Sequence, residues 1–387
     1  MKRSFLLLTA IAAALALPSC IAYRAVCYGT PGIDDYRTFP QDTIRKGDAS
    51  FRFAELPDGA RPLDTLRAFR SHGELRTLRE ALDAEDKKFS CGILLIRNDT
   101  ILLECYRGVI QREAVSTVFS VNKSLTALLC GIAVDEGYIR SIHDPVTDYL
   151  PELRDADPHF ARLTVEQLLD MRAGLKFNEN YSFNPFSGMA RLHYGRNMLR
   201  MMRHLKFSEE PGTSFRYCSM VTAILGLVIE RATGRSYADY MSEKVWQPLG
   251  MEGDALMSVN AVRKRYPRSY GGLSTTARDL AKVARLYLHR GQFEGRQIVD
   301  PAWIDTTLSI ERAYANTGGN LRGYSYSWWH NRRLVTDEEG KRLTDGFFQM
   351  VGMLGQVVSI DPERNTILVI LTNRELHPEV CQLLETL

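Results

Sequence analysis

The order of secondary-structure patterns along this 387-residue chain limits its fold more than any other feature. Strand patterns near both ends, the first two flanking an Asn98-Asp99 turn, are Cys91–Ile96, Thr100–Tyr106, Tyr324–His330, Phe347–Val351, Gln356–Ile360 and Thr366–Leu371. Helical patterns dominate between residues 120 and 250. Because hairpin-connected strands pair antiparallel, this order predicts an α+β fold, with a mainly antiparallel sheet flanked by helices and an inserted all-helical domain.

The same patterns give the expected domain boundaries. Residues 73–137 and 265–387 are expected to form a discontinuous α/β domain, residues 138–264 the helical domain, and the turn-rich residues 20–72 a tether and lead-in segment. Helices are expected at Glu74–Lys87, over the apolar run Ser124–Ala133, after a capping box at Thr164–Gln167, at Val221–Ala232 and over the last ten residues.

The first residues have the pattern of a secretion signal. A basic start precedes an apolar run, Phe5–Leu17, that is too short to span a bilayer, which takes about 20 helical residues. The run ends in Leu17-Pro18-Ser19-Cys20, which resembles the lipobox of bacterial lipoproteins. The resemblance implies a signal peptide at residues 1–19, lipidation of Cys20, and an exported, membrane-anchored protein facing the periplasm or the cell surface. Ordinary cleavage after a small residue, releasing a soluble exported product, is the alternative.

Charge and composition argue against several kinds of partner. A formal net charge of +3, without a long Lys/Arg run, gives no reason to expect nucleic-acid binding. The seven cysteines include no C-x-x-C pair and the eight histidines no H-x-x-x-H spacing, so neither a metal nor another cofactor is expected. Export permits disulfides, and Cys91 and Cys105, which flank the first hairpin, could approach each other, but the sequence cannot assign pairings.

The sharpest chemical signal is Phe119-Ser120-Val121-Asn122-Lys123, at the start of an apolar helical run. Residues three apart share one face of a helix, so the Ser120 hydroxyl and the Lys123 amine are expected to meet. A serine hydroxyl is a poor nucleophile at neutral pH and needs a base, which a neutral lysine amine can supply. The helix N-terminus would also favour developing negative charge. Taken alone, however, S-x-x-K arises more often as a capping serine followed by a surface lysine.

Two further segments strengthen the catalytic interpretation of this motif. Tyr217-Cys218-Ser219 lies between Pro211-Gly212 and an apolar helix, where a tyrosine can pass a proton between a nucleophile and a leaving group. Gly271–Leu280 combines a glycine turn with the start of a helix, and we interpret it as a structural turn.

With these motifs the chain resembles the serine β-lactamase-like superfamily, in its class C and penicillin-binding branch. The resemblance covers about residues 75–375 through the ordered motifs Ser120-x-x-Lys123, Asp144–Pro151, Leu163–Leu169, Ala173–Leu175, Tyr217-x-Ser219, Pro248–Met251, the Gly271 segment and Ile360–Pro362. It implies a cleft between the two domains and an acyl-enzyme on Ser120, with Lys123 and Tyr217 accepting its proton. It also implies an oxyanion hole formed by the backbone N–H groups of Ser120 and Met353.

The third motif of the superfamily, Lys-Thr-Gly or His-x-Gly, is altered in this chain. It is expected at Met350-Val351-Gly352 or, in another register, at Met353-Leu354-Gly355, and neither carries a cation. In β-lactamases that cation helps to engage the substrate carboxylate, so its absence lowers the expectation of β-lactam turnover. Phe347–Gln356 instead resembles the 6-aminohexanoate-dimer hydrolase and esterase branch. That branch has a substrate-binding loop tyrosine, matched here by Tyr181, although a packed loop aromatic would give the same pattern.

The expected function is therefore cleavage of an ester or amide bond in a small acyl substrate. Tyr181, Ser219, Gly352 and Gln356 are the expected substrate contacts. One alternative is an enzyme acting on β-lactams or peptidoglycan peptides, and another is a sensor or binding lipoprotein with little turnover. A structural lipoprotein with a coincidental motif fits the ordered motifs least. The chain lacks the G-x-S-x-G elbow, which argues against an α/β-hydrolase.

Overall fold

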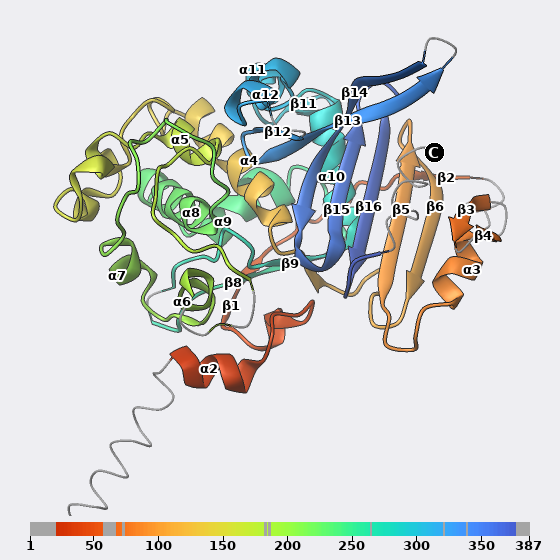
Figure 1. Cartoon of the computed structure of the whole chain (residues 1–387), viewed down its shortest axis with the longest axis horizontal. Helices are drawn as coiled ribbons and strands as arrows, with labels where there is room; N and C mark the ends of the chain where they lie inside the picture. Colours follow the sequence, from red (N-terminus) through yellow and green to blue (C-terminus); the bar gives the residue numbers. More distant parts are fainter. Residues whose placement is uncertain are drawn as a thin grey trace, which may run out of the picture.

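Strands from the two ends of the chain lie side by side in one eight-stranded sheet, drawn as orange and blue arrows in Figure 1. In spatial order the strands are β12 (Arg322–Ser325), β13 (Trp328–Asp337), β14 (Gly340–Gly352), β15 (Gln356–Asp361), β16 (Thr366–Thr372), β5 (Cys91–Arg97), β6 (Thr100–Arg107) and β2 (Ala54–Glu55). The pairs described between these strands are antiparallel except that of β2 and β6, which is parallel. With the helices that cover it, this sheet confirms the predicted α+β class.

The structure is a computed structural model that describes residues 21–56, 67–71, 74–181, 184, 187–263, 265–319, 322–337 and 340–376. The predicted signal peptide, Cys20 and the helix expected over the last ten residues lie outside these ranges. Within them, no helix combines the length and the apolar character needed to cross a membrane. Export and lipidation of Cys20 therefore stay predictions from the sequence.

A second, smaller sheet contains the strand that leads into the central helix. Its order is β1 (Gln41–Ile44), β8 (Ala255–Ser258), β9 (Leu273–Thr275) and β7 (Ser116–Thr117), and each pair is antiparallel. Short hairpins join β3 (Arg67–Ser71) to β4 (Glu74–Thr77) and β10 (Gln292–Phe293) to β11 (Arg296–Gln297). Since β1 belongs to the expected tether and lead-in, part of that segment is packed against the body of the protein.

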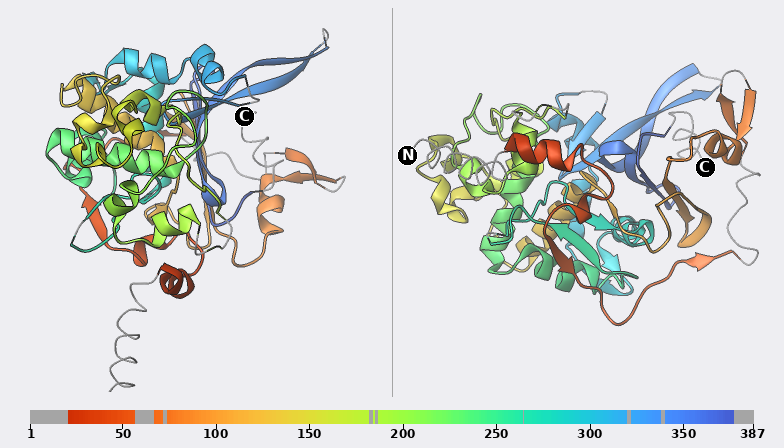
Figure 2. Two further views of the ribbon diagram at one scale, coloured as in Figure 1. Left: turned by 60° about the vertical axis from the view of Figure 1, so that its left-hand side comes forward. Right: turned by 90° about the horizontal axis from the view of Figure 1, so that it is seen from below.

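Helices form one lobe beside the large sheet and also cover the sheet itself (Figures 1 and 2). They are α2 (Ile21–Tyr28), α3 (Leu78–Asp83), α4 (Val121–Asp135), α5 (Val165–Leu169), α6 (Gly188–Tyr194), α7 (Met198–Met202), α8 (Ser219–Thr233), α9 (Tyr237–Met241), α10 (Ala277–Leu288), α11 (Pro301–Thr307) and α12 (Ile310–Asn316). Alternate residues of β5 enter two cores. Ile93 and Leu95 pack with α3, while Leu94 and Ile96 belong to the core built by α4, α8 and α10. Because successive strand residues point to opposite faces, both faces of the sheet are buried.

Helix α4 is the central element of the fold. Its buried residues run without a break from Val121 to Ala133, which explains why this stretch reads as a dense apolar run rather than an amphipathic one. One side of α4 packs on α8 in the helical lobe, and the helix also contacts β14 and β15 of the large sheet. The N-terminus of α4 therefore lies where the two lobes meet.

Several local predictions are confirmed because short-range chemistry determines them. Asn98 and Asp99 have φ angles of 50° and 57°, which suit the tight turn between β5 and β6. Thr164 and Gln167 form the expected reciprocal capping box at the start of α5. Gly234 ends α8 in the left-handed conformation, with φ 66°, as expected of a C-terminal glycine.

Two local predictions are wrong. The single strand expected at Tyr324–His330 is two strands, because Tyr326 and Ser327 turn the chain with φ angles of 41° and 65°. The helix expected over Glu74–Lys87 is confined to α3 and follows strand β4. Its start is fixed by a capping box in which the Thr77 side chain accepts from the Glu80 N–H and the Glu80 carboxylate accepts from the Thr77 N–H.

We predict that Asn122→Ala lowers the free energy of unfolding by about 1–3 kcal/mol. Asn122 is fully buried, its amide donates to the Ser269 carbonyl at 2.8 Å, and its oxygen accepts from the Tyr237 hydroxyl at 3.3 Å. These bonds fasten α4 to two distant segments. Urea unfolding would measure the loss, with the surface amide variant Gln111→Ala as the control. Equal stability of the two variants would contradict this role.

Candidate active site

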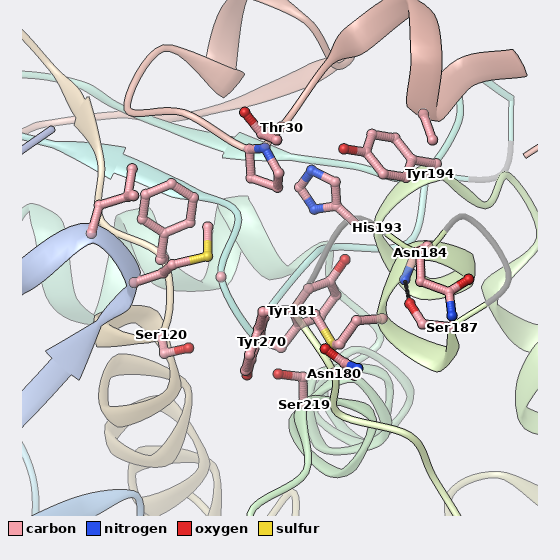
Figure 3. A pocket seen from close by; sticks show the side chains of 18 residues that line it. Thr30, Ser120, Asn180, Tyr181, Asn184, Ser187, His193, Tyr194, Ser219 and Tyr270 are labelled. Atoms are coloured by element: carbon pink, nitrogen blue, oxygen red, sulfur yellow. Dashed lines mark hydrogen bonds between the residues drawn. The ribbon is translucent and has the colours of Figure 1, made fainter. Parts of the chain in front are cut away.

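A sharp turn between β7 and α4 presents Ser120 at the start of the helix. Phe119, the residue before it, has φ 48°, a left-handed conformation that costs a bulky residue about 1–3 kcal/mol. The Phe119 side chain is buried, and the Val118 N–H donates to the Leu273 carbonyl at 2.9 Å, so the surrounding packing holds the turn. The Ser120 hydroxyl makes no capping bond to the helix. The turn leaves it facing a pocket, as Figure 3 shows.

The buried amine of Lys123 meets the Ser120 hydroxyl, as the sequence predicts. Lys123 Nζ lies 2.8 Å from Ser120 Oγ and also donates to the Tyr270 carbonyl at 2.8 Å. The lysine side chain is only 1% exposed. Tyr270 belongs to the segment interpreted from the sequence as a structural turn, so this turn also supplies an acceptor that positions the amine.

Tyr217 lies beside the same amine. The centre of its ring is 5.1 Å from Lys123 Nζ. The ring stacks on Trp329 of β13, with 5.7 Å between centroids and an interplanar angle of 22°. Arg322 lies over the other ring of this stack, with its guanidinium carbon 4.5 Å from the Trp329 centroid. The structure thus brings Ser120, Lys123 and Tyr217 together, and Trp329 is a supporting residue that sequence reasoning missed.

Glu179 is a second residue that sequence reasoning named only as a neighbour of Tyr181. One of its carboxylate oxygens accepts from the Ser219 N–H at 2.9 Å, and the other accepts from the Ser219 hydroxyl at 2.5 Å. The Tyr181 hydroxyl donates to that second oxygen as well. Because Ser219 begins α8, the carboxylate lies at the positive end of a 15-residue helix. Glu179 therefore ties the Tyr217 turn, α8 and the Tyr181 loop together.

The pocket in front of Ser120 has a volume of about 230 Å³. Its walls come from distant parts of the chain. Besides Ser120, the lining residues are Ala25, Thr30, Pro31, Phe119, Asn180, Tyr181, Asn184, Ser187, Met189, Ala190, His193, Tyr194, Ser219, Tyr270, Gly271, Met353 and Leu354. Among the described residues that line it, none is Lys, Arg, Asp or Glu. His193 is the titratable imidazole on its wall, and burial lowers the pKa of that ring, which keeps it neutral at pH 7. The pocket therefore presents an uncharged lining.

The remaining predicted site residues fall into two groups. Met353, Ser219 and Tyr181 line the pocket, although the Ser219 hydroxyl points to Glu179. Gly352 does not line it. An added Cβ there would lie 2.4 Å from the Val118 carbonyl oxygen, so glycine allows the end of β14 to approach the Ser120 turn.

Gln356 is not a pocket residue either, which corrects its prediction as a substrate contact. Its side chain is fully buried, and its amide nitrogen donates to the Thr372 carbonyl. Its oxygen accepts from the Thr372 N–H at 3.2 Å. Both ends of the amide thus join β15 to β16, and the residue has a structural role.

Arg322 and Arg374 are the arginines near the third motif that could have replaced its missing cation. Arg374 pairs with Glu85 and Asp86, which follow α3, and Arg322 covers Trp329. Neither lines the pocket. In the part of the chain that the structure describes, no group of three or more His, Cys, Asp or Glu side chains is arranged to hold a metal. The five cysteines described there, Cys91 and Cys105 included, are free thiols.

Comparisons with known proteins show which family the chain resembles. A family model described as Beta-lactamase matches residues 78–383. The 6-aminohexanoate-dimer hydrolase of Paenarthrobacter ureafaciens is 29% identical over 297 residues, which cover 72% of this chain and 71% of that protein. Esterase EstB of Burkholderia gladioli is 29% identical over 193 residues, covering 45% and 48% of the two chains. A Bacillus anthracis structure assigned as a 6-aminohexanoate-dimer hydrolase shares the fold, with TM-score 0.74, 24% identity, and coverage of 89% of this chain and 88% of its own.

We predict that Glu179→Ala lowers kcat/KM roughly 10- to 100-fold, about 1.4–2.8 kcal/mol of transition-state stabilisation, while the protein stays folded. Removal of the carboxylate frees Tyr181 and leaves the N-terminus of α8 without its acceptor. Steady-state kinetics and thermal unfolding would measure the two effects. Glu209→Ala is the matched control, because Glu209 also accepts from a serine hydroxyl, that of Ser214, but Ser214 does not line the pocket, whereas Ser219 does. Equal activity of the two variants would exclude the positioning role of Glu179.

Proposed function

This chain belongs to the beta-lactamase family, and we propose that it is a serine hydrolase that cleaves an uncharged ester or amide through an acyl-enzyme on Ser120. The observation that carries the proposal is the 2.8 Å contact between Ser120 Oγ and the buried Lys123 Nζ at the wall of a pocket. Relatives in this family are hydrolases of amides and esters, by the names of the 6-aminohexanoate-dimer hydrolase and esterase EstB.

In the acylation step Lys123 acts as the general base. Ser120 Oγ attacks the substrate carbonyl carbon and passes its proton to Lys123 Nζ, which is already within hydrogen-bond distance. The tetrahedral intermediate carries negative charge on the former carbonyl oxygen. We assign the stabilisation of that charge to the backbone N–H groups of Ser120 and Met353, one such donor typically contributing about 2.7–4 kcal/mol.

Collapse of the intermediate requires a proton for the leaving group. Tyr217 lies beside Lys123, so its phenol can donate to the leaving oxygen or nitrogen and regain a proton from the lysine. The bond to the leaving group breaks, and the acyl group remains on Ser120. A water molecule then attacks the ester, gives its proton to the same pair, and the proton returns to Ser120 as the acid leaves.

The charge of the pocket lining supports a neutral substrate over an anionic one. A β-lactam or a D-Ala-D-Ala peptide carries a carboxylate, which in β-lactamases the cation of the third motif helps to engage. Here the described pocket lining contains no lysine or arginine, and Arg322 and Arg374 are engaged elsewhere. Burial of an unpaired carboxylate is costly, so the lining favours a neutral ester or amide.

We predict that Ser120→Ala abolishes hydrolysis of a short-chain p-nitrophenyl ester, with a loss of roughly 10³-fold or more in kcat. Ser124→Ala is the matched control, because Ser124 lies one turn later in the same helix and its hydroxyl donates to the Ser327 carbonyl. A chromogenic cephalosporin and a D-Ala-D-Ala peptide complete the panel. Serine-dependent turnover of the cephalosporin at enzymatic rates would replace this proposal with a β-lactamase, and acylation without release would indicate a sensor.

We predict that Lys123→Ala folds but acylates at least roughly 10²-fold more slowly, since Ser120 then lacks its base. Intact-protein mass spectrometry after mixing with the ester would follow the acyl-enzyme, and circular dichroism would test folding. A Lys123→Ala variant that acylated at the wild-type rate would show that another group accepts the serine proton.

A further inference from the structure

The segment that begins directly after Cys20 forms part of the pocket. Ala25 of α2, Thr30 and Pro31 line the cavity that also contains Ser120. Figure 2 shows α2, in red, against the helical lobe, and Figure 3 shows Thr30 across the cavity from Ser120. The sequence predicted only a tether and lead-in for these residues, so their place on the pocket wall is new.

Specific contacts hold this segment against α6 on one flank. The buried Arg24 guanidinium donates from Nε to the Tyr194 carbonyl at 2.6 Å. The Tyr194 hydroxyl donates back to the Gly29 carbonyl. The two bonds join the helix α2 and the turn after it to the last residue of α6, which is itself on the pocket wall.

The other flank is hydrogen-bonded to β7, the strand that precedes the nucleophile turn. The Thr117 N–H donates to the Ile33 carbonyl at 2.8 Å, three residues before Ser120. Just after Ile33, Asp35 lies 3.3 Å from His193 Nε2, and Phe39 packs edge-on against the His193 ring with 4.9 Å between centroids. The segment therefore bridges the helical lobe and β7, and its position relative to Ser120 is fixed from both sides.

We propose that Ala25, Thr30 and Pro31 form the far wall of the acyl pocket and set the length of the uncharged acyl chain that the enzyme accepts. The cavity is bounded by Ser120 at one side and Thr30 at the other, so a chain esterified to Ser120 extends toward this wall. Apolar groups of Phe119, Met189 and Ala190 lie along the same cavity and suit methylene groups. This inference depends on the acyl-enzyme at Ser120 proposed above, and names its substrate class.

Thr30→Trp and Pro31→Trp place a large ring on the proposed wall, and Val26→Trp is the matched control. Val26 belongs to the same segment but is 71% exposed and does not line the pocket. A series of p-nitrophenyl esters from acetyl to dodecanoyl gives kcat/KM against chain length. In both wall variants the chain length with the highest kcat/KM should be shorter than in the wild type. Their kcat/KM for the longest ester should fall roughly 10-fold or more, while that for the acetate ester should stay near the wild-type value. An unchanged profile in both would overturn the proposal.

A binding measurement separates this inference from the hydrolase assignment. In a Ser120→Ala background, which cannot acylate, titration calorimetry gives the Kd of N-methyloctanamide and N-methylacetamide. The wall variants should raise the Kd of the octanamide roughly 10-fold while Val26→Trp leaves it unchanged. Failure of the wild-type protein to cleave any ester or amide would refute the hydrolase assignment, whereas the octanamide Kd would still test the proposed role of the wall. Equal octanamide affinities in all variants, or no octanamide binding, would refute the proposal that this wall sets the length of the acyl chain.

Discussion

The buried amine of Lys123 is the interaction on which the organisation of the site depends. A polar group with 1% exposure must be hydrogen-bonded by protein, and the two acceptors at 2.8 Å are the Ser120 hydroxyl and the Tyr270 carbonyl. The amine therefore ties α4 to the turn before α10, with the Tyr217 ring beside it. The need to satisfy one buried group thus brings three distant segments to the point where the reaction is proposed to occur.

The fold supports this point by packing α4 where the lobes meet. Strands from both ends of the chain complete one sheet, so the helices between them are held against α4 by covalent continuity as well as by packing. The tight packing around the start of α4 holds Phe119 in its left-handed backbone conformation, because the neighbouring groups leave no room for it to relax. Gly352 contributes by its lack of a side chain, which lets the end of β14 lie against the Val118 carbonyl. The nucleophile turn is therefore shaped from the sheet side and from the helix side together.

The parts of the site that the sequence predicts are those determined by local geometry. Ser120 and Lys123 are three residues apart on a helix, and their contact follows from helical spacing. Glu179 binds Ser219, which is 40 positions away, and Trp329 stacks on Tyr217, which is 112 positions away. No spacing rule predicts contacts over such separations. The division of Tyr324–His330 into two strands was missed for a related reason. Its turn is made by Tyr326 and Ser327, which have none of the Gly, Pro or Asn signals that mark turns.

The charges of the site lie behind the pocket lining rather than in it. Lys123 and Glu179 have opposite charges when ionised, and each is bound by protein groups: Ser120 and Tyr270 for the lysine, Ser219 and Tyr181 for the carboxylate. A substrate therefore meets hydroxyls, amides and apolar groups, and the charged groups act on it only through Ser120 and the tyrosines. A site arranged in this way can activate a nucleophile without exposing an ionisable group to the ligand, because protein groups hydrogen-bond both the Lys123 amine and the Glu179 carboxylate. The shape of the cavity then selects among substrates, and specificity is expected to depend on the wall formed by Ala25, Thr30 and Pro31.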